Sequence, residues 1–289
     1  MVTNSLAILC PAKINLGLSI LSRRDDGFHD LDTVFIPVSL WDQLSVGIAT
    51  ASQDSFTCAP IVCQPSDNLV MQCLNRYRQL RPDVPFLEIQ LTKEIPAKAG
   101  LGGGSSNAAS MLNWLNSHYP LPMEEIQRIA LSLGSDVPFF LSPTPARGQG
   151  RGELLTKLEI SQEIPILIVK PAQGIFTKSA FEWLHQNQRA DGKPLYTEQI
   201  VNALNSKRYC DLFELAPNRF TECFLEMLPE YRSIPQFFLE TGADFFSLSG
   251  SGSAWYGIYS VASSRSNAVC KAHPDWQLFV CSSLNSNKT

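Results

Sequence analysis

The sequence predicts an α+β protein with two domains. Stretches with the alternating apolar pattern of strands occur beside stretches with the apolar spacing of helices, in both halves of the chain. With 289 residues, the chain is longer than most single domains. Helical patterns dominate from Lys178 to Thr241, after a first half that mixes strands and helices. We therefore expect an N-terminal domain over residues 1–163 and a C-terminal domain over 164–289.

The first half opens with strand patterns and continues with helical ones. β-branched residues and apolar alternation predict strands joined by short turns over 14–20, 33–41, 43–49 and 86–93. Asp67 precedes apolar residues at helical spacing, which predicts a helix over 67–80 with Asp67 as its N-cap. Two further helices are predicted over 105–118 and 123–133, and the second ends at Gly134.

The second half begins with strands, continues with helices and returns to strands. Residues 135–141 are expected to form a loop that leads into a short apolar segment, and residues 153–170 to form a hairpin. Two strand-like runs, 245–261 and 276–283, flank a helical pattern at 263–272. This order predicts a small α+β sandwich.

Composition excludes several classes of protein. Hydrophobic residues make up 44% and charged residues 17% of the chain, so a folded core is expected. The formal net charge of −4 is unsuited to coating nucleic acid or an anionic membrane, although it is compatible with a local basic pocket. The eight cysteines form no CxxC pair, which indicates free thiols rather than disulfides or zinc ligands. No apolar run reaches 18 residues and no secretory pattern opens the chain, so a cytoplasmic protein is expected.

The most informative stretch is KAGLGGGSSNAASMLNWLN, residues 98–116. Glycines and serines come directly before a helical pattern there, at Gly100, Gly102, Gly103, Gly104, Ser105 and Ser106. The start of a helix has N–H groups without partners and a dipole that favours anions, and glycines let a phosphate approach the backbone. A tight turn would explain one or two glycines, and neither the P-loop pattern nor a dinucleotide-binding fingerprint fits. We therefore predict a phosphate cradle in which serine hydroxyls donate or help to ligate magnesium.

Three motifs together resemble the GHMP kinases, small-molecule kinases named after galactose, homoserine, mevalonate and phosphomevalonate. PAKAGLGGGSSNAA (96–109) resembles their central motif, PAKINLGLSI (11–20) their N-terminal motif and SLSGSGSAWYG (247–257) their C-terminal glycine motif. The resemblance implies a ribosomal protein S5 domain 2-like N-terminal half and a ferredoxin-like C-terminal half, with ATP and substrate meeting in the cleft between them. It also implies ATP-dependent phosphorylation of an alcohol, with Mg²⁺ carried by the ATP phosphates rather than by a dedicated protein site.

Further stretches narrow the resemblance to one kind of GHMP kinase. RRDDGFHDLDTVF (23–35), LGSDVPFFL (133–141) and GRGELL (150–155) are similar to a member that phosphorylates the 2-hydroxyl of a cytidine diphosphate-linked methylerythritol, in the non-mevalonate (methylerythritol phosphate) route to isoprenoids. Another GHMP kinase, of mevalonate or homoserine type, is the first alternative. A non-catalytic GHMP-fold binding protein is the second, and the intact Lys13, Asp136 and glycine loop argue against it.

The resemblance implies two catalytic residues, Lys13 and Asp136. An alcohol loses a proton as it attacks, and Asp136 is the candidate to accept it, although the residues alone leave a helix-capping role before Pro138 equally open. Strand alternation puts Lys13 and Asn15 on one face, so that both point away from the core. The resemblance implies that Lys13 stabilises the ionised Asp136 and the developing alkoxide, and that Asn15 hydrogen-bonds the substrate.

The resemblance also implies a pocket for the cytosine ring. Phe28 would stack on the ring and His29 would hydrogen-bond its edge. Phe181 would form the opposite wall and Thr177 a polar contact. By themselves, a phenylalanine is usually a core residue and an isolated histidine is usually structural. The family often has tyrosine where this chain has Phe28, a change that removes a phenol oxygen and keeps the stacking.

ATP is expected to contact the central motif and two residues outside it. The motif contributes Pro96, Ala97, Lys98, Ala99, Gly100, Leu101, Gly102, Gly103, Gly104, Ser105 and Ser106. Asn68 and Lys93 are candidates for adenine or ribose, while a helix-start asparagine and a solvated strand-end lysine are equally open. Gly250 and Gly252 can let a second stretch of backbone approach. The other histidines lack the spacing of a metal site. The protein is expected to be a monomer or a weak dimer.

Overall fold

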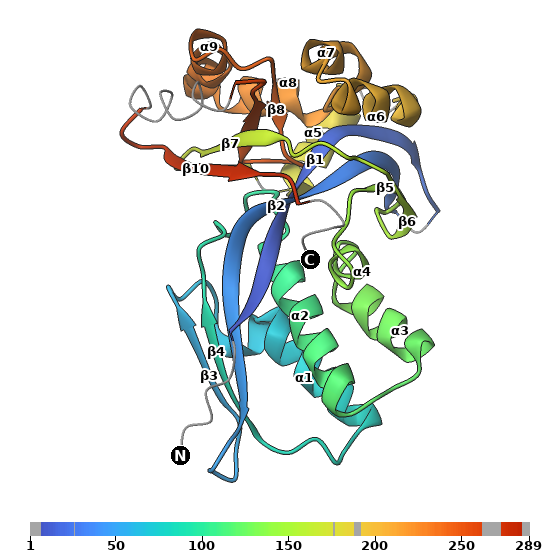
Figure 1. Cartoon of the computed structure of the whole chain (residues 1–289), viewed down its shortest axis with the longest axis vertical. Helices are drawn as coiled ribbons and strands as arrows, with labels where there is room; N and C mark the ends of the chain where they lie inside the picture. Colours follow the sequence, from blue (N-terminus) through green and yellow to red (C-terminus); the bar gives the residue numbers. More distant parts are fainter. Residues whose placement is uncertain (1–6, 26, 176, 188–191, 262–272, 285–289) are drawn as a thin grey trace. The chain divides into compact units, whose positions relative to one another are not determined.

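The computed structural model describes residues 7–25, 27–175, 177–187, 192–261 and 273–284 (Figure 1). Contacts divide the chain into two compact units. Unit 1 comprises Met1–Ala12, Leu40–Ala97 and Gly102–Pro143, and unit 2 comprises Lys13–Ser39, Lys98–Leu101 and Thr144–Thr289. Both units contain helices and strands, which confirms the α+β class. The boundary near residue 163 stays a prediction.

Unit 1 has a sheet with helices on one side of it (Figure 1). Its elements are the second part of β2 (His29–Ile48), β3 (Ser55–Ala59), β4 (Leu87–Thr92), α1 (Leu69–Leu80), α2 (Gly103–His118), α3 (Met123–Leu133) and α4 (Val137–Phe140). β4 pairs antiparallel with residues 43–48 of β2 and parallel with β3. Alternate residues of β4 are buried, namely Leu87, Ile89 and Leu91. This alternation is the one that the sequence shows, and it is typical of a sheet with one covered face.

The start of α1 shows how local capping sets the bounds of a helix. Asn68, and not Asp67, is the N-cap, because the Asn68 side chain accepts a hydrogen bond from the N–H of Val70 at 3.0 Å. Asp67 belongs instead to a 3-10 turn, Pro65–Asp67. The predicted cap was therefore wrong by one residue. Helix α3, in contrast, spans the predicted residues and ends before its C-cap residue, Gly134.

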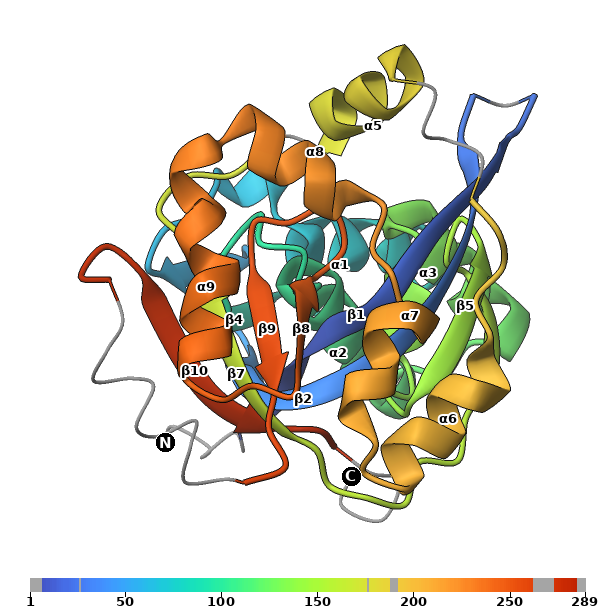
Figure 2. The ribbon, with the colours of Figure 1, turned by 90° about the horizontal axis from the view of Figure 1, so that it is seen from above.

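Unit 2 contains an antiparallel four-stranded sheet in the order β10-β7-β9-β8. Its elements are β7 (Pro165–Lys170), β8 (Phe245–Leu248), β9 (Trp255–Ile258), β10 (Gln277–Ser282), α5 (Thr177–Gln186), α6 (Thr197–Asn205), α7 (Leu212–Leu215), α8 (Phe220–Met227) and α9 (Ser233–Glu240). Figures 1 and 2 show α8 and α9 over one face of this sheet. Phe224 of α8 packs edge-on against Trp255, and Phe238 of α9 stacks on Phe246. Aromatic packing therefore forms the centre of the unit 2 core.

The first part of β2 is held within unit 2 by pairing and by a buried ion pair. β1 (Ile8–Arg23) pairs with β2, residues 31–35 of β2 pair with β5 (Ala146–Gly150), and β5 pairs with β6 (Leu154–Lys157). Arg147 donates to both carboxylate oxygens of the fully buried Asp32, at 2.8 and 2.7 Å. The N–H of Leu195 donates to the same carboxylate at 2.9 Å. These bonds fix the strand that begins with His29.

The structure corrects several expectations about single elements. Residues 33–41 and 43–49 belong to one continuous strand, β2, because Asp42 between them is a buried hydrogen-bond acceptor rather than a turn residue. Residues 153–170 form no hairpin, since β6 pairs with β5 while the apolar β7 lies between β9 and β10. The last part of the loop predicted over 135–141 forms the short helix α4.

Two strands had no clear sequence signal. β3 has only partly buried residues, and β5 contains Gly148 and Gly150, which weaken the pattern of a strand. The run 245–261 holds two strands, β8 and β9, rather than one. The helical pattern at 263–272 lies outside the described residues. In the part of the chain that the structure describes, no helix has the length and apolar character needed to cross a membrane.

Candidate active site

The glycine loop leads into α2 through residues in the left-handed region. Lys98, Gly100 and Gly102 have φ angles of 54°, 77° and 71°, and Gly102 is the N-cap residue of α2. The N–H of Ser106 donates a hydrogen bond to the carbonyl of Gly102 at 2.9 Å. The N–H groups of Gly103, Gly104 and Ser105 find no acceptor among the described residues, as expected for the first turn of a helix. Three main-chain donors at the positive end of a helix dipole fit an oxyanion.

A buried hydroxyl at the same helix start also lacks a partner. Ser106 Oγ is fully buried and makes no hydrogen bond within the described part of the chain. An unsatisfied hydroxyl of this kind costs roughly 1–3 kcal/mol. A phosphate or a hydrated cation at the first turn of α2 would therefore find both N–H donors and a hydroxyl there.

Asp136 lies in the turn that joins α3 to α4, next to the start of α2. It is half-buried and is the N-cap residue of α4, as the helix-capping alternative expects, although its side chain makes no capping hydrogen bond to that helix. A Cβ atom on Gly134 would lie 3.9 Å from Ser105 Oγ, so this turn packs against the first turn of α2. Within unit 1, a carboxylate and a set of main-chain donors thus come from adjacent segments.

Beneath this helix start lies a buried polar network that sequence analysis missed. Lys93 Nζ forms an ion pair with Asp42 and donates to Asn107 Oδ1 at 3.0 Å, with the lysine side chain only 6% exposed. Asp42 also accepts from the N–H groups of Glu94 and Ile95, at 2.8 and 2.9 Å. The alternative of a solvated strand-end lysine was therefore wrong. The network holds α2 against the end of β4, and an ATP contact by Lys93 stays a prediction.

Asn68 serves unit 1 as a helix cap. It is buried, and its side chain accepts from Val70 N–H and donates to Cys63 Sγ at 3.8 Å. The alternative that Asn68 is a helix-start asparagine is therefore confirmed. A contact between Asn68 and ATP stays a prediction.

In unit 2 the three sequence motifs meet in one buried network. Lys13 Nζ donates to Gly100 O at 3.0 Å and to Asn15 Oδ1, and both side chains are almost fully buried. Ser249 Oγ donates to the same Gly100 carbonyl at 2.9 Å and accepts from Asn15 N–H at 3.2 Å. Asn15 Nδ2 donates to Thr33 Oγ1 at 3.0 Å. Lys13 and Asn15 thus lie together as predicted, but they are buried by the C-terminal motif.

Ser249 and Thr33 belong to this network without having been predicted. The repeated serines of SLSGSGS gave a weak signal for Ser249, whereas nothing in the sequence distinguished Thr33. Gly250 has a φ of 59°, and a Cβ atom there would lie 3.2 Å from Asn15 Oδ1. The glycine at this position therefore lets the C-terminal motif approach the N-terminal one, as proposed from the sequence.

The residues predicted for the cytosine pocket lie at the start of β2 and along α5. Phe181 stacks on His29 with ring centroids 4.8 Å apart and planes 17° apart. Phe28 is 52% exposed, and the guanidinium of Arg151 lies 4.4 Å from the centre of its ring. Thr177 Oγ1 hydrogen-bonds Ser251 Oγ at 2.9 Å. Burial first, then His185 and then Arg23 hold the pKa of His29 below its ordinary value.

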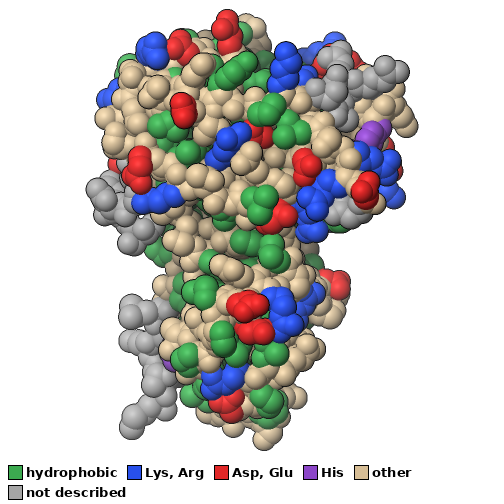
Figure 3. All heavy atoms as spheres, turned by 90° about the vertical axis from the view of Figure 1, so that its right-hand side faces the viewer, with side chains coloured by type: hydrophobic (Ala, Val, Ile, Leu, Met, Phe, Trp, Pro, Cys, Tyr) green, Lys and Arg blue, Asp and Glu red, His purple; other side chains and the backbone are tan. Residues whose placement is uncertain are grey.

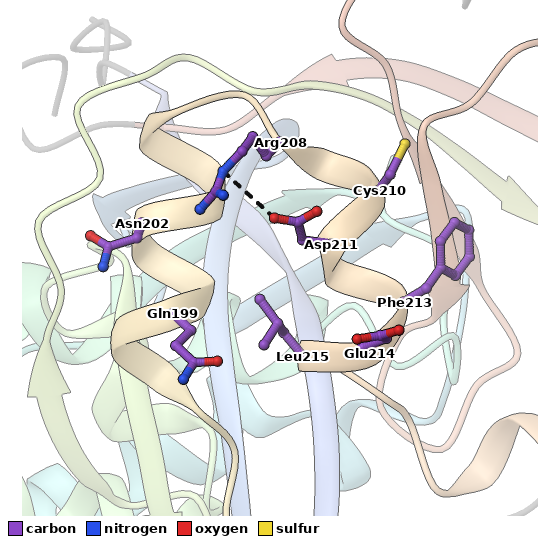
Figure 4. Close-up of a pocket in the computed structure, with 8 residues that line it drawn as sticks. All are labelled: Gln199, Asn202, Arg208, Cys210, Asp211, Phe213, Glu214 and Leu215. Atoms are coloured by element: carbon purple, nitrogen blue, oxygen red, sulfur yellow. Dashed lines mark ion pairs between the residues drawn. The ribbon is translucent and has the colours of Figure 1, made fainter.

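A pocket beside α6 and α7 and the charged side chains on one face are separate from the predicted site residues. A pocket of about 510 Å³ lies beside α6 and α7, where Arg208 pairs with Asp211 at 3.6 Å (Figure 4). None of the predicted site residues lines it. On the face drawn in Figure 3, basic and acidic side chains are interspersed. Neither feature resembles an ATP site.

Comparison with known proteins decides the family. The sequence pattern of the GHMP kinases N terminal domain matches residues 68–143, which include the glycine loop and Asp136. A 4-diphosphocytidyl-2-C-methyl-D-erythritol kinase from Chlorobium luteolum is 35% identical over 271 residues, 92% of this chain and 92% of that protein. The chain belongs to this kinase family. The 4-diphosphocytidyl-2-C-methyl-D-erythritol kinase of Thermotoga maritima is 34% identical over 257 residues, covering 89% of this chain and 93% of its own.

Solved structures agree with membership of the 4-diphosphocytidyl-2-C-methyl-D-erythritol kinase family. A crystal structure of 4-(cytidine 5'-diphospho)-2C-methyl-D-erythritol kinase matches with a TM-score of 0.83 and 29% identity, over 96% of this chain and 99% of that one. A homoserine kinase from Cytophaga hutchinsonii matches with a TM-score of 0.71 at 17% identity, which shows the shared fold alone. The resemblance to the GHMP kinases is confirmed. The protein is an ATP-dependent small-molecule kinase.

Proposed function

We propose that the protein transfers the γ-phosphate of ATP to the 2-hydroxyl of 4-diphosphocytidyl-2-C-methyl-D-erythritol. The products are the 2-phosphate and ADP, and the reaction belongs to the non-mevalonate route to isoprenoids. One observation carries this proposal: relatives named for this substrate share 35% identity with the chain over nine-tenths of both lengths. The protein would act in the cytoplasm as a monomer or weak dimer.

The phosphate side of the reaction is assigned to the start of α2. The N–H groups of Gly103, Gly104 and Ser105, which have no acceptor among the described residues, would bind phosphate oxygens. The Ser106 hydroxyl, which has no partner in that part of the chain either, suits a phosphate or the Mg²⁺ that ATP carries. Mg²⁺ would neutralise charge on the transferring phosphoryl group. The chain's own contribution is to present donors without reorganisation, because the left-handed Gly102 already turns the backbone into the helix.

The acceptor side is assigned to Asp136 and Lys13. Asp136 would accept the proton of the substrate hydroxyl as that oxygen attacks the γ-phosphorus. The position of Asp136 supports this role, because its turn packs against the first turn of α2, where the phosphate would bind. Lys13 would stabilise the developing alkoxide by its charge, and Asn15 would bind the substrate.

The cytidine side is assigned to Phe28, His29 and Phe181. The exposed ring of Phe28 offers a stacking surface, and Arg151 covers part of that ring. His29 supplies a hydrogen bond to the edge of cytosine, while Phe181 and Thr177 line the opposite side. A stacked base contributes roughly 1–3 kcal/mol to binding.

A different acceptor is the alternative, because kinases for homoserine and mevalonate share this fold at 17% and 13% identity. Their fold does not select the acceptor, so the choice rests on the Phe28–His29 segment. A non-catalytic role is disfavoured because the residues of all three motifs are present.

A panel of acceptors tests the proposal. ADP release is measured with 4-diphosphocytidyl-2-C-methyl-D-erythritol, mevalonate, homoserine and galactose. We expect turnover with the first only, and an increase in melting temperature on addition of cytidine 5′-monophosphate. Turnover with mevalonate or homoserine instead would favour the alternative, and no turnover with any alcohol would favour the non-catalytic role.

A further inference from the structure

We infer that His185 is a positioning residue for the base pocket, which holds the His29 ring in one orientation and couples its tautomer to that of His185. The inference rests on the proposed function, in which His29 contacts the edge of cytosine. No sequence pattern connects the two histidines, which are 156 positions apart.

The geometry places His29 between two side chains of the same helix face. His185 lies one helical turn after Phe181 on α5, so both face the same way. Phe181 stacks on the His29 ring at 4.8 Å, and the Nε2 atoms of His29 and His185 lie 2.9 Å apart. His29 is only 8% exposed. Its ring is therefore held both by stacking and by a hydrogen bond.

α5 is itself anchored at several points. Thr177 at its start hydrogen-bonds Ser251, and Phe181 packs edge-on against Phe220 with centroids 5.0 Å apart. Ala180 is buried in the core of unit 2. The helix therefore offers His185 from a defined position, which a positioning residue requires.

An N–H···N bond between two imidazoles couples their tautomers. One ring donates its Nε2–H, which leaves its Nδ1 as an acceptor, and the other accepts at Nε2, so that its neutral form carries the proton on Nδ1. His29 then offers cytosine either a donor, for the ring carbonyl or N3, or an acceptor, for the 4-amino group. The proton position on His185 and the edge pattern that His29 can read are therefore coupled.

The surroundings of His29 favour its neutral form, because they lower its pKa. Arg23 on β1 and His185 on α5 are the charged or titratable groups that act on His29, and burial adds to their effect by lowering its pKa. Neighbouring charged groups on these elements pair with each other: Glu182 with Lys178, and Asp30 with Arg24. In acid, protonated His29 would have donors at both ring nitrogens and could no longer act as an acceptor.

Kinetics of variants at His185 test the inference. His185→Leu removes the hydrogen bond, and we expect KM for the cytidine substrate to rise about tenfold while kcat and KM for ATP stay within about twofold. His185→Gln can still donate or accept, and it should restore most of the lost affinity. Glu182→Gln, an exposed change on the same helix, is the matched control and should behave as wild type. An unchanged KM in His185→Leu, or an equal change in KM for ATP, would overturn the inference.

Imidazole NMR separates this inference from the proposed function. Long-range ¹H–¹⁵N correlation should show complementary tautomers of His29 and His185 in the wild type and a changed tautomer population of His29 in His185→Leu, with a higher pKa for His29 once its neighbour is gone. If the wild type fails to phosphorylate the cytidine substrate, the proposed function fails, and binding of cytidine 5′-monophosphate, followed at His29, then decides the inference. A tautomer and pKa of His29 that are the same with and without His185 would refute it.

Discussion

The phosphate side and the base side of this kinase are built in different ways. On the proposed phosphate side, main-chain N–H groups at the start of α2 would supply the donors, after a left-handed Gly102. On the proposed base side, side chains would supply the contacts, and there Phe181 stacks on His29 and Arg151 lies over Phe28. Main-chain donors fit any phosphate, whereas rings of fixed shape and polarity fit few ligands. If these assignments hold, the type of reaction depends on backbone geometry and the choice of substrate depends on side chains.

Kinases named for other acceptors share the fold of this chain. Homoserine kinase and mevalonate kinase share the fold with TM-scores of 0.71 and 0.69, at 17% and 13% identity. Proteins with different named acceptors therefore keep the same framework. A variant of the catalytic residue Asp136 should accordingly change kcat, whereas a variant of the base side should change KM for the cytidine substrate.

Asp136→Asn is expected to have the largest effect. Asparagine keeps the shape of the side chain but cannot accept a proton, so kcat should fall roughly 10³-fold with little change in either KM. ADP release measures the rate, and circular dichroism checks the fold. Asp211→Asn, which alters an exposed acid paired with Arg208, is the control and should keep kcat within about twofold. A kcat for Asp136→Asn within tenfold of wild type would remove Asp136 as the base.

Gly100→Ala tests the backbone geometry of the glycine loop on the phosphate side. A Cβ atom there would lie 2.1 Å from the carbonyl oxygen of Ser249, and the φ of 77° is unfavourable for alanine. We expect a loss of about 3 kcal/mol in the free energy of unfolding, measured with urea. Gly104→Ala is the matched control, because its Cβ would meet only Leu69 Cδ1 at 3.6 Å. Equal stability of the two variants would show that the loop tolerates other backbone paths.

Phe28→Ala tests the base side. Loss of a stacking surface worth roughly 1–3 kcal/mol should raise KM for the cytidine substrate by about 5- to 150-fold and leave KM for ATP unchanged. Phe28→Tyr should preserve the stacking and keep KM close to wild type. A parallel rise in both KM values after Phe28→Ala would contradict the separation of the two sides.

The smallest effect is expected from protonation of His29. Its pKa is lowered from 6.5 by burial, His185 and Arg23, so below that pH the unfolded chain binds a proton that the folded chain resists. This contribution to the free energy of unfolding is fully present above pH 6.5 and declines as the pH falls below it. Urea unfolding between pH 8 and pH 5 should show a smaller decline in His29→Gln than in the wild type. Parallel curves would exclude His29 as the group responsible.

The parts of the site that sequence analysis could predict are contiguous in the chain. The glycine loop is one run of residues, and Phe28 and His29 are neighbours, so each forms a recognisable pattern. Arg151 and His185 could not be found in this way, because they meet these residues only after folding. A contact between distant residues leaves no periodic signal in a single sequence.

The same reason explains the errors in the fold. Asp42 resembles a turn residue until Lys93 and the N–H groups beyond it are placed around its carboxylate. The segment of β7 resembles one arm of a hairpin until β9 and β10 pair with it from both sides. Helix α3, whose apolar face and ending are local features, was predicted correctly.

The most direct measurement is ³¹P NMR of the reaction of wild-type protein with Mg²⁺-ATP and 4-diphosphocytidyl-2-C-methyl-D-erythritol. We predict one new phosphomonoester resonance for each ADP formed, accompanied by a ¹³C shift at C2 of the methylerythritol. ADP formed without that resonance, or a phosphate on a different hydroxyl, would contradict the assignment of this kinase.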